Sequence, residues 1–252
     1  MWHTLLYQPL LNALFLFYRL FNNFGLSIIA MTFLLRLALM PLTLPSLKAS
    51  RKIKELTSEI NKLKKKHGKN KQAFSKAQLE LYKKHGVNPA AGCLPQIIQL
   101  LVLIAFFQAF NQVLQANGDI VANLNEVLYS FLRFSPGAMI NTRFLYLELT
   151  QPDTFVLGSI KLPGLFLVGS ALAQFFSSKL MSPALSGAEK LAKKTPGESD
   201  DMAVTMQKQM TYMLPFMTIL VGFNFPSGLV LYWLVFSLTN LAQHLWLNKK
   251  KK

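Results

Sequence analysis

Long uncharged stretches alternate with short charged segments along this chain of 252 residues. Three of the stretches, at residues 86–118, 162–178 and 209–248, contain no charged side chain if histidine is counted as neutral. A helix needs about 20 mostly apolar residues to cross a membrane, and soluble core helices seldom run so long without charge. The pattern therefore predicts membrane-spanning helices.

Five spans account for these stretches and for an apolar run near the N-terminus. The last stretch is too long for one helix, and Pro226 and Gly228 near its middle predict a turn that divides it. A turn this tight favours a positive φ at Gly228. The predicted spans are residues 24–47, 90–114, 162–181, 209–225 and 229–247.

The segment before the first span, residues 1–23, is predicted to be an amphipathic helix. Apolar side chains recur there at helical spacing, with polar residues between them. The segment has no basic n-region and no A-x-A-like cleavage site, so it does not resemble a cleavable signal. We expect it to lie on the outer membrane interface. A sixth membrane span is the alternative.

Composition and charge narrow the class of protein. Hydrophobic residues make up 52% of the chain and charged residues 15%, yet the net charge is +16. The apolar content argues against intrinsic disorder and against an ordinary soluble nucleic-acid binder. A single cysteine excludes a disulfide framework within the chain.

Much of the positive charge is concentrated between Lys48 and Lys84, where 13 basic and 3 acidic residues lie. A turn signal at residues 67–70 divides this segment, and apolar residues at helical spacing flank it on both sides. Those residues are Ile53, Leu56, Ile60 and Leu63 before the turn, and Phe74, Ala77 and Leu81 after it. Residues 48–86 are therefore predicted to form a helical hairpin outside the membrane.

The positive-inside rule places this hairpin in the cytoplasm. With five spans, the N-terminus and the loop 115–161 then lie outside, and the loop 182–208 and the basic tail 248–252 lie inside. The hairpin lysines can form a solvated face, contact anionic headgroups or contact ribosomal RNA. Its candidate residues for client recruitment are Lys52, Lys54, Lys64, Lys65 and Lys66.

Arg36 is the one charged residue inside the first predicted span, close to its centre. A charge at mid-membrane costs about 2.5–3.5 kcal/mol, so Arg36 is expected to face the protein interior or a wet cavity. None of the five predicted spans contains an acidic residue, which favours a transient anionic ligand over a fixed ion pair. A structural arginine bonded to backbone carbonyls or a polar partner is the alternative.

Polar residues of the other spans are candidates for a hydrophilic groove around Arg36, although amides inside membranes also bond neighbouring helices. Those singled out as groove residues are Gln96, Gln99, Gln174, Tyr232 and Asn240.

Signatures of catalysis are lacking: the four histidines show no metal-ligand spacing with Cys93, and no G-x-S-x-G, H-E-x-x-H or P-loop motif occurs. We therefore expect no catalytic residue, no metal, no cofactor and no enzyme activity.

Three motifs occur in order along the chain. Leu35-Arg36 is followed by Pro41-Leu42-Thr43, GVNPAAGCLPQ occupies Gly86–Gln96 with an NP-x-x-GC-x-P pattern, and FPSGLVLYW occupies Phe225–Trp233. Together they resemble the YidC/Oxa family of membrane protein insertases, in its short bacterial form without a large periplasmic domain. Phe236-Ser237 and Gln243-His244 stand where the family often has Ser-Asn and Gln-Gln.

The resemblance implies an all-α polytopic membrane protein: five core helices around a groove that is open to the cytoplasm and to lipid and closed outward. It implies that Arg36 is the groove arginine, that Tyr232 and Trp233 lie on the substrate-contacting helix, and that the basic hairpin is the family's first cytoplasmic loop. The implied location is the bacterial cytoplasmic membrane.

The expected function is that of an insertase and chaperone, which inserts and helps fold newly made membrane proteins without nucleotide hydrolysis. A small-solute channel or uniporter using the same cavity is the alternative. The expected partners are nascent membrane proteins and the lipid bilayer, with the ribosome, the signal recognition particle receptor and the Sec translocon as further candidates.

Overall fold

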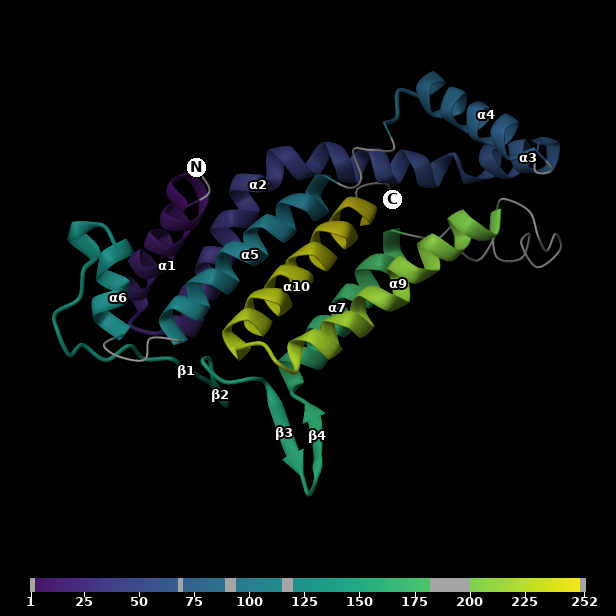
Figure 1. The fold of residues 1–252 in the computed structure, drawn as a ribbon. Coiled ribbons are helices and arrows are strands. Elements are labelled where there is room, and N and C mark those ends of the chain that lie inside the picture. The colour runs from purple at the N-terminus through teal and green to yellow at the C-terminus, as the bar shows by residue number, and fades with distance from the viewer. Residues whose placement is uncertain (1–2, 68–69, 89–93, 115–119, 182–199, 250–252) are drawn as a thin grey trace.

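The computed structural model describes residues 3–67, 70–88, 94–114, 120–181 and 200–249. Most of these residues lie in helices packed into one bundle (Figure 1). The helices are α1 (Gln8–Phe21), α2 (Phe24–Glu55), α3 (Thr57–His67), α4 (Lys71–Lys84), α5 (Leu94–Leu114), α6 (Ile120–Val127), α7 (Leu165–Met181), α9 (Asp200–Gly222) and α10 (Ser227–Lys249).

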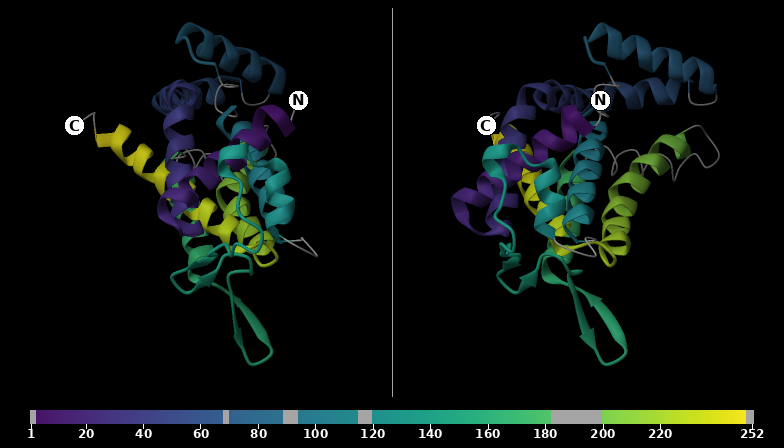
Figure 2. Two further views of the ribbon diagram at one scale, coloured as in Figure 1. Left: turned by 90° about the vertical axis from the view of Figure 1, so that its left-hand side faces the viewer. Right: turned by 60° about the vertical axis from the view of Figure 1, so that its left-hand side comes forward.

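Most of the described residues are helical, as predicted, but short strands occur between residues 143 and 163, and the last of them extends two residues into the predicted span 162–181. They form two separate antiparallel pairs, β1 (Arg143–Phe144) with β2 (Leu147–Glu148), and β3 (Thr154–Leu157) with β4 (Ile160–Pro163). The second pair closes through Gly158 at a φ of 61°, a backbone conformation that glycine adopts without steric cost. The strands and the α3–α4 pair lie at opposite ends of the molecule (Figures 1 and 2).

Four helices, α1, α2, α5 and α10, share the main apolar core. Phe15 of α1, Ile28 of α2, Phe106 of α5 and Leu229 of α10 are all buried in it. On the far side from α1, α7 packs against both α10 and α9 (Figure 1). This packing brings the polar residues of α2, α5 and α10 together.

The outer surface of the bundle is strongly apolar. Leu37, Leu100, Phe176 and Phe216, from four different helices, are each more than half exposed, at 67%, 55%, 51% and 59%. Large exposed apolar surfaces mark contact with a membrane or another protein. Among the described residues, Phe24–Ile53 is long and apolar enough to cross a membrane, and three shorter apolar helices accompany it: Ile97–Gln108, Leu165–Leu180 and Thr211–Gly222.

The first predicted span and the start of the predicted hairpin belong to one continuous helix. The 32 residues of α2 run through Pro41 and Pro45, which the sequence pattern placed near the end of the span. A proline inside a helix removes one backbone donor and usually bends the helix without having to end it. The chain breaks from α2 only at Leu56, so the hairpin consists of the end of α2 together with α3 and α4.

A small core of its own holds this hairpin together. Leu56, Tyr82 and Val87 are buried in it, and Ile53 and Ile60 pack against them. The turn between the arms leads into α4 through Asn70, whose side-chain oxygen accepts from the backbone N–H groups of Gln72 and Ala73, both at 3.1 Å. This is a normal N-cap for a helix. The hairpin core is separate from the main core, so the hairpin contributes little to the packing of the bundle.

The turn at Pro226 is a helix start, so the positive φ suited to Gly228 is not found. Among the described glycines, only Gly86, Gly137 and Gly158 have a positive φ. Gly228 lies in the first turn of α10, where its N–H donates to the Leu149 carbonyl at 3.0 Å. The first N–H groups of a helix have no acceptors within the helix. Here carbonyl groups of the segment before β3 accept from them.

Candidate functional site

The Arg36 side chain reaches from α2 to α10, where three neutral groups hold it. Its Nε donates to Thr239 Oγ1 at 3.2 Å and its Nη2 donates to the Phe236 carbonyl at 3.4 Å. The guanidinium also lies over the Phe236 ring, 4.1 Å from the ring centre. Among the described residues no carboxylate forms an ion pair with it. Within the part of the chain that the structure describes, Arg36 is therefore a cation with neutral partners and no counter-ion.

Phe236 and Thr239 were not among the groove residues predicted from the sequence. They lie beside Arg36 because α10 turns one face toward α2, and residues three and four apart share a helix face. Tyr232, Phe236, Thr239, Asn240 and Gln243 follow that spacing. The periodicity was present in the sequence, but it gave no sign that an aromatic ring and a backbone carbonyl would hold an arginine.

Tyr232 lies in the core and not on an open groove wall. Its side chain is 1% exposed, its ring stacks on Phe106 at 4.6 Å, and its hydroxyl donates to Gln99 Oε1 at 3.2 Å. The place of Tyr232 on a substrate-contacting helix therefore stays a prediction, and in this structure the stacked Phe106 ring covers its side chain. Trp233 is half-buried against Phe225, with ring centres 5.9 Å apart.

Several buried polar atoms near Arg36 have no hydrogen-bond partner within the described part of the chain. They are Gln99 Nε2 on α5, and Gln243 Oε1 and His244 Nε2 on α10. Gln99 is bonded to Tyr232, one helical turn before Phe236, and Gln243 lies one turn after Thr239. Buried polar groups usually have partners, so this region is suited to water or to a polar ligand.

Gln174 does not join this cluster. Its Oε1 accepts from Thr218 Oγ1 at 2.8 Å, which ties α7 to α9. That contact is a bond between neighbouring helices, the role that the sequence offered as the alternative to lining the groove. Asn240 is half-buried on the α10 face that contains Thr239. The side chain of Gln96 lies outside the described residues.

The candidate recruitment lysines lie on the hairpin, far from Arg36. Lys52 and Lys66 are exposed, and the side chains of Lys54, Lys64 and Lys65 lie outside the described residues. His85 at the end of α4 pairs with Glu59 on α3 at 3.6 Å, which closes the hairpin base. Within the described part of the chain no group of three or more histidine, cysteine or acidic residues is placed to hold a metal ion.

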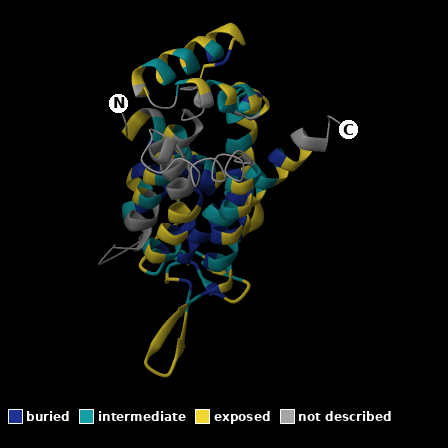
Figure 3. Ribbon diagram, turned by 90° about the vertical axis from the view of Figure 1, so that its right-hand side faces the viewer, coloured by how far each residue is buried: buried dark blue, intermediate teal, exposed yellow. Residues whose placement is uncertain are grey.

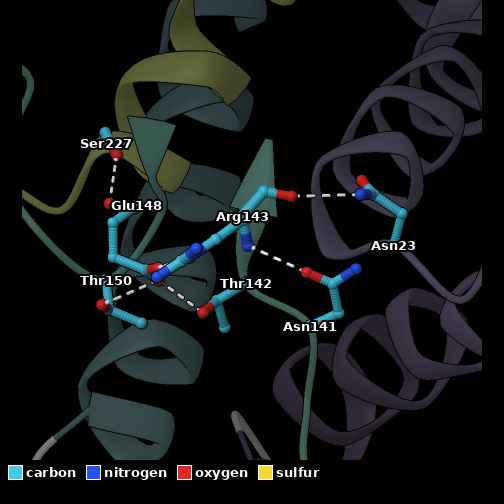
Figure 4. A network of polar contacts seen from close by, with 7 residues as sticks. All are labelled: Asn23, Asn141, Thr142, Arg143, Glu148, Thr150 and Ser227. Carbon is cyan, nitrogen blue, oxygen red and sulfur yellow. Dashed lines mark hydrogen bonds and ion pairs between the residues drawn. The ribbon is translucent and has the colours of Figure 1, made fainter. Parts of the chain in front are cut away.

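A network of polar contacts closes the opposite end of the bundle, around the two short strands β1 and β2 (Figure 4). Asn23 donates through Nδ2 to the Arg143 carbonyl at 3.0 Å, and Ser227 donates through Oγ to the Glu148 carbonyl at 2.8 Å. The carboxylate of Glu148 accepts from the hydroxyls of Thr142 and Thr150. These contacts tie the first residues of α2 and α10 to one loop.

Asp153 ties the same loop to the first turn of α7. Its carboxylate, in a side chain 1% exposed, accepts from Leu167 N–H at 2.8 Å and from the Tyr146 hydroxyl at 2.9 Å. An acidic group at a helix N-terminus is stabilised by the unpaired N–H groups and the helix dipole. Burial and the bond to Asp153 raise the pKa of Tyr146 to about 12. We call residues 141–153 the outer clasp.

The polar side chains of α1 are bonded to the segment that leads into the outer clasp. Asn12 donates to the Val127 carbonyl at 3.1 Å and accepts from Tyr129 N–H at 2.6 Å. The Tyr18 hydroxyl accepts from Asn141 N–H at 2.7 Å, and Arg19 donates to the Leu132 carbonyl at 3.2 Å. The polar residues of α1 therefore bind this loop, while its apolar face packs in the bundle.

Comparison with known proteins agrees with this architecture. A profile of the family described as the 60Kd inner membrane protein matches residues 16–252. The chain belongs to this family. A relative from Fusobacterium nucleatum named membrane protein insertase YidC is 33% identical over 229 residues, which cover 91% of this chain and 88% of the relative.

Other members of the 60Kd inner membrane protein family are longer. A membrane protein insertase YidC from Pelobacter propionicus is 32% identical over 98% of this chain, but the match covers 39% of that protein. A crystal structure of an active YidC insertase with its first transmembrane domain resolved matches with a TM-score of 0.54 and 25% identity. That match covers 94% of this chain and 46% of the solved one, so the chain corresponds to part of these longer relatives.

Proposed function

We propose that this chain inserts newly made membrane proteins into the bilayer and helps them fold, without hydrolysing a nucleotide. Family membership and relatives named membrane protein insertase support the proposal. The observation that carries the mechanism is Arg36, a cation held only by neutral groups of α10 among the described residues. Weak partners of this kind can be exchanged for an acidic group of a passing client.

The topology we propose follows from the two ends of the molecule. The basic hairpin lies at one end and the outer clasp at the other (Figure 1), which suits a hairpin in the bacterial cytoplasm and a clasp outside. The membrane portion then comprises the five spans, with α1 at the outer interface. The outer clasp would close the bundle outward, so clients reach Arg36 from the cytoplasm and from lipid.

The mechanism lowers the cost of moving a polar tail across the apolar interior. A carboxylate at 4 Å from Arg36 in surroundings of dielectric constant about 20 gains about 4 kcal/mol before the desolvation of both groups is subtracted. The unpaired atoms of Gln99, Gln243 and His244 offer further bonds to the tail. The tail then passes while its apolar segment moves into lipid alongside the exposed apolar helices.

The partners we propose are nascent membrane proteins and the bilayer. The exposed lysines of the hairpin, Lys52 and Lys66 among them, supply positive charge where the ribosome, the signal recognition particle receptor or the Sec translocon would approach. Positive surfaces of this kind attract RNA phosphates and acidic proteins at long range.

The test is insertion of a single-span client into proteoliposomes, with the acidic residues of its translocated tail present or changed to Asn and Gln. Arg36→Ala should reduce protection of the acidic tail from protease and affect the neutral tail little. Arg36→Lys should keep much of the activity, because charge does the attracting. Equal losses for both tails would refute the proposed role of Arg36, and passage of small solutes without client protection would indicate a channel.

A further inference from the structure

The β3–β4 hairpin has one face made only of apolar side chains. In its register Phe155 is opposite Leu162, and Leu157 is opposite Ile160. Directly opposed residues share a face of an antiparallel pair, and so do residues two apart along a strand. These four residues therefore lie on one face. Val156, opposite Lys161, lies on the other.

The apolar face has little cover. Leu157 is 71% exposed and Ile160 64%. Nearer the base, Phe155 is 43% and Leu162 42% exposed, and the Tyr146 ring stacks on Phe155 at 5.7 Å. The whole hairpin projects from the bundle and is coloured as exposed along most of its length (Figure 3). A two-stranded hairpin alone in water is marginally stable, so this face requires a partner.

Exposed apolar side chains also occur along α7. Leu165, two residues after β4, is 67% exposed, and Leu172 and Phe176 follow it on the same helix at 51% each. The spacing of seven and four puts the three on one helical stripe. The medium around the exposed side of α7, water or lipid, therefore also surrounds the base of the hairpin.

The lengths fit a bilayer. The 17 residues of α7 span about 26 Å at 1.5 Å per residue, which is less than the hydrocarbon thickness of about 30 Å. Strands of four residues add about 14 Å. The sum of about 40 Å matches a bilayer with its headgroup regions, about 40–45 Å.

We propose that the β3–β4 hairpin is an anchor in the outer leaflet, with its apolar face against lipid. This rests on the membrane location proposed above for α7. Phe155 and Leu162 lie near the hydrocarbon boundary, and Leu157 and Ile160 reach into the headgroup region. The strand edges stay in the hydrated interface, where water satisfies their free backbone groups. Lys161, on the opposite face, is placed to meet lipid phosphates.

The test measures lipid exposure on each face. In a Cys93→Ser background, Leu157→Cys and Val156→Cys are labelled with a nitroxide and reconstituted in phosphatidylethanolamine–phosphatidylglycerol vesicles. Collisions with oxygen, which concentrates in lipid, are compared with collisions with a water-soluble nickel chelate. The proposal expects the oxygen-to-nickel ratio to be severalfold higher at position 157 than at its neighbour 156. Ile160→Cys repeats the measurement on the apolar face.

Equal nickel access at 156 and 157 would place the hairpin in water and overturn the proposal. Shielding of both positions from both reagents would show that protein covers the hairpin, and would also overturn it. Leu172→Cys on α7 is the reference. If that position itself were open to nickel, the membrane location of α7 under the proposed function would fail, an outcome distinct from failure of the anchor alone.

Discussion

Arg36 is a half-buried charge that neutral groups hold in place. Two roles were predicted from the sequence, a structural arginine and a site for a transient anion, and these contacts are compatible with both. The Thr239 hydroxyl and the Phe236 carbonyl hold the guanidinium through hydrogen bonds to uncharged acceptors, which contribute about 1.5–3 kcal/mol each because the donor is charged. Under the proposed function, an arriving carboxylate adds the attraction of an opposite charge to its hydrogen bonds, so exchange would favour the client.

Thr239→Val should therefore separate stability from function. Loss of the hydroxyl removes the bond that it accepts from the charged Arg36 and the bond that it donates to the α10 backbone. The free energy of unfolding should therefore fall by about 1.5–3 kcal/mol, while insertion of acidic clients stays at or above that of the unaltered protein. Thr218→Val is the control, because Thr218 bonds Gln174 away from Arg36. Thermal unfolding in detergent and the insertion assay measure the two effects. A loss of insertion specific to Thr239→Val would contradict the exchange.

Tyr146 should make stability depend on pH in the alkaline range. Its pKa rises from 10.0 to about 12 in the folded protein, so the folded state favours the neutral phenol. The stability gained this way is complete below about pH 10 and is lost as the pH rises through about 12. Unfolding measured between pH 9 and pH 12 should show a smaller decline for Tyr146→Phe. Parallel declines would show that Tyr146 does not contribute.

Helices α7 and α9 meet through a glycine that leaves no room for a larger residue. A Cβ on Gly222 would lie 2.3 Å from Leu167 Cδ1, in a side chain that is itself fully buried. Gly222→Ala should therefore lower the free energy of unfolding by about 1–3 kcal/mol through overpacking. Gly169→Ala is the control, since its Cβ would meet only Leu234 Cδ1, at 3.3 Å. Similar unfolding temperatures for both variants would contradict the close contact.

The α3–α4 hairpin should be separable from the bundle, because Leu56, Tyr82 and Val87 form a core of their own. Replacing residues 56–88 with a short Gly/Ser linker should leave a folded protein in detergent but lower insertion. Lys52→Gln with Lys66→Gln, which removes charge and keeps the hairpin, should reduce insertion less. Aggregation of the shortened protein would show that the hairpin also supports the bundle.

The sequence predicted the helices better than the contacts between them. Long apolar runs located α5, α7 and α10, and helical spacing brought Ile53, Leu56 and Ile60 to the hairpin core. The outer clasp was not predicted, because the bonds that tie it to the starts of α2 and α10 join backbone groups to side chains more than 70 positions away, as between Ser227 and Glu148. Such contacts leave no periodic signal.

Under the proposed topology, the molecule as a whole is polar inside at its cytoplasmic end and closed at its outer end. Toward the outer end, Phe106, Tyr232, Phe225 and Trp233 form aromatic contacts above Arg36, and the outer clasp ties α2, α7 and α10 together. Toward the hairpin end, the unpaired atoms of Gln243 and His244 continue the polar face of α10. Water should therefore enter from one side only.

A membrane-impermeant maleimide should detect this asymmetry. In the Cys93→Ser background, Asn240→Cys should react in inside-out vesicles and resist the reagent in right-side-out vesicles, because the aromatic contacts and the clasp block the outer path. Met139→Cys, at a side chain 96% exposed in the loop before the clasp, should show the reverse and verifies the orientation of the vesicles. Reaction of Asn240→Cys from the outer side alone, with Met139→Cys behaving as expected, would mean that the bundle opens outward and that the clasp does not seal it.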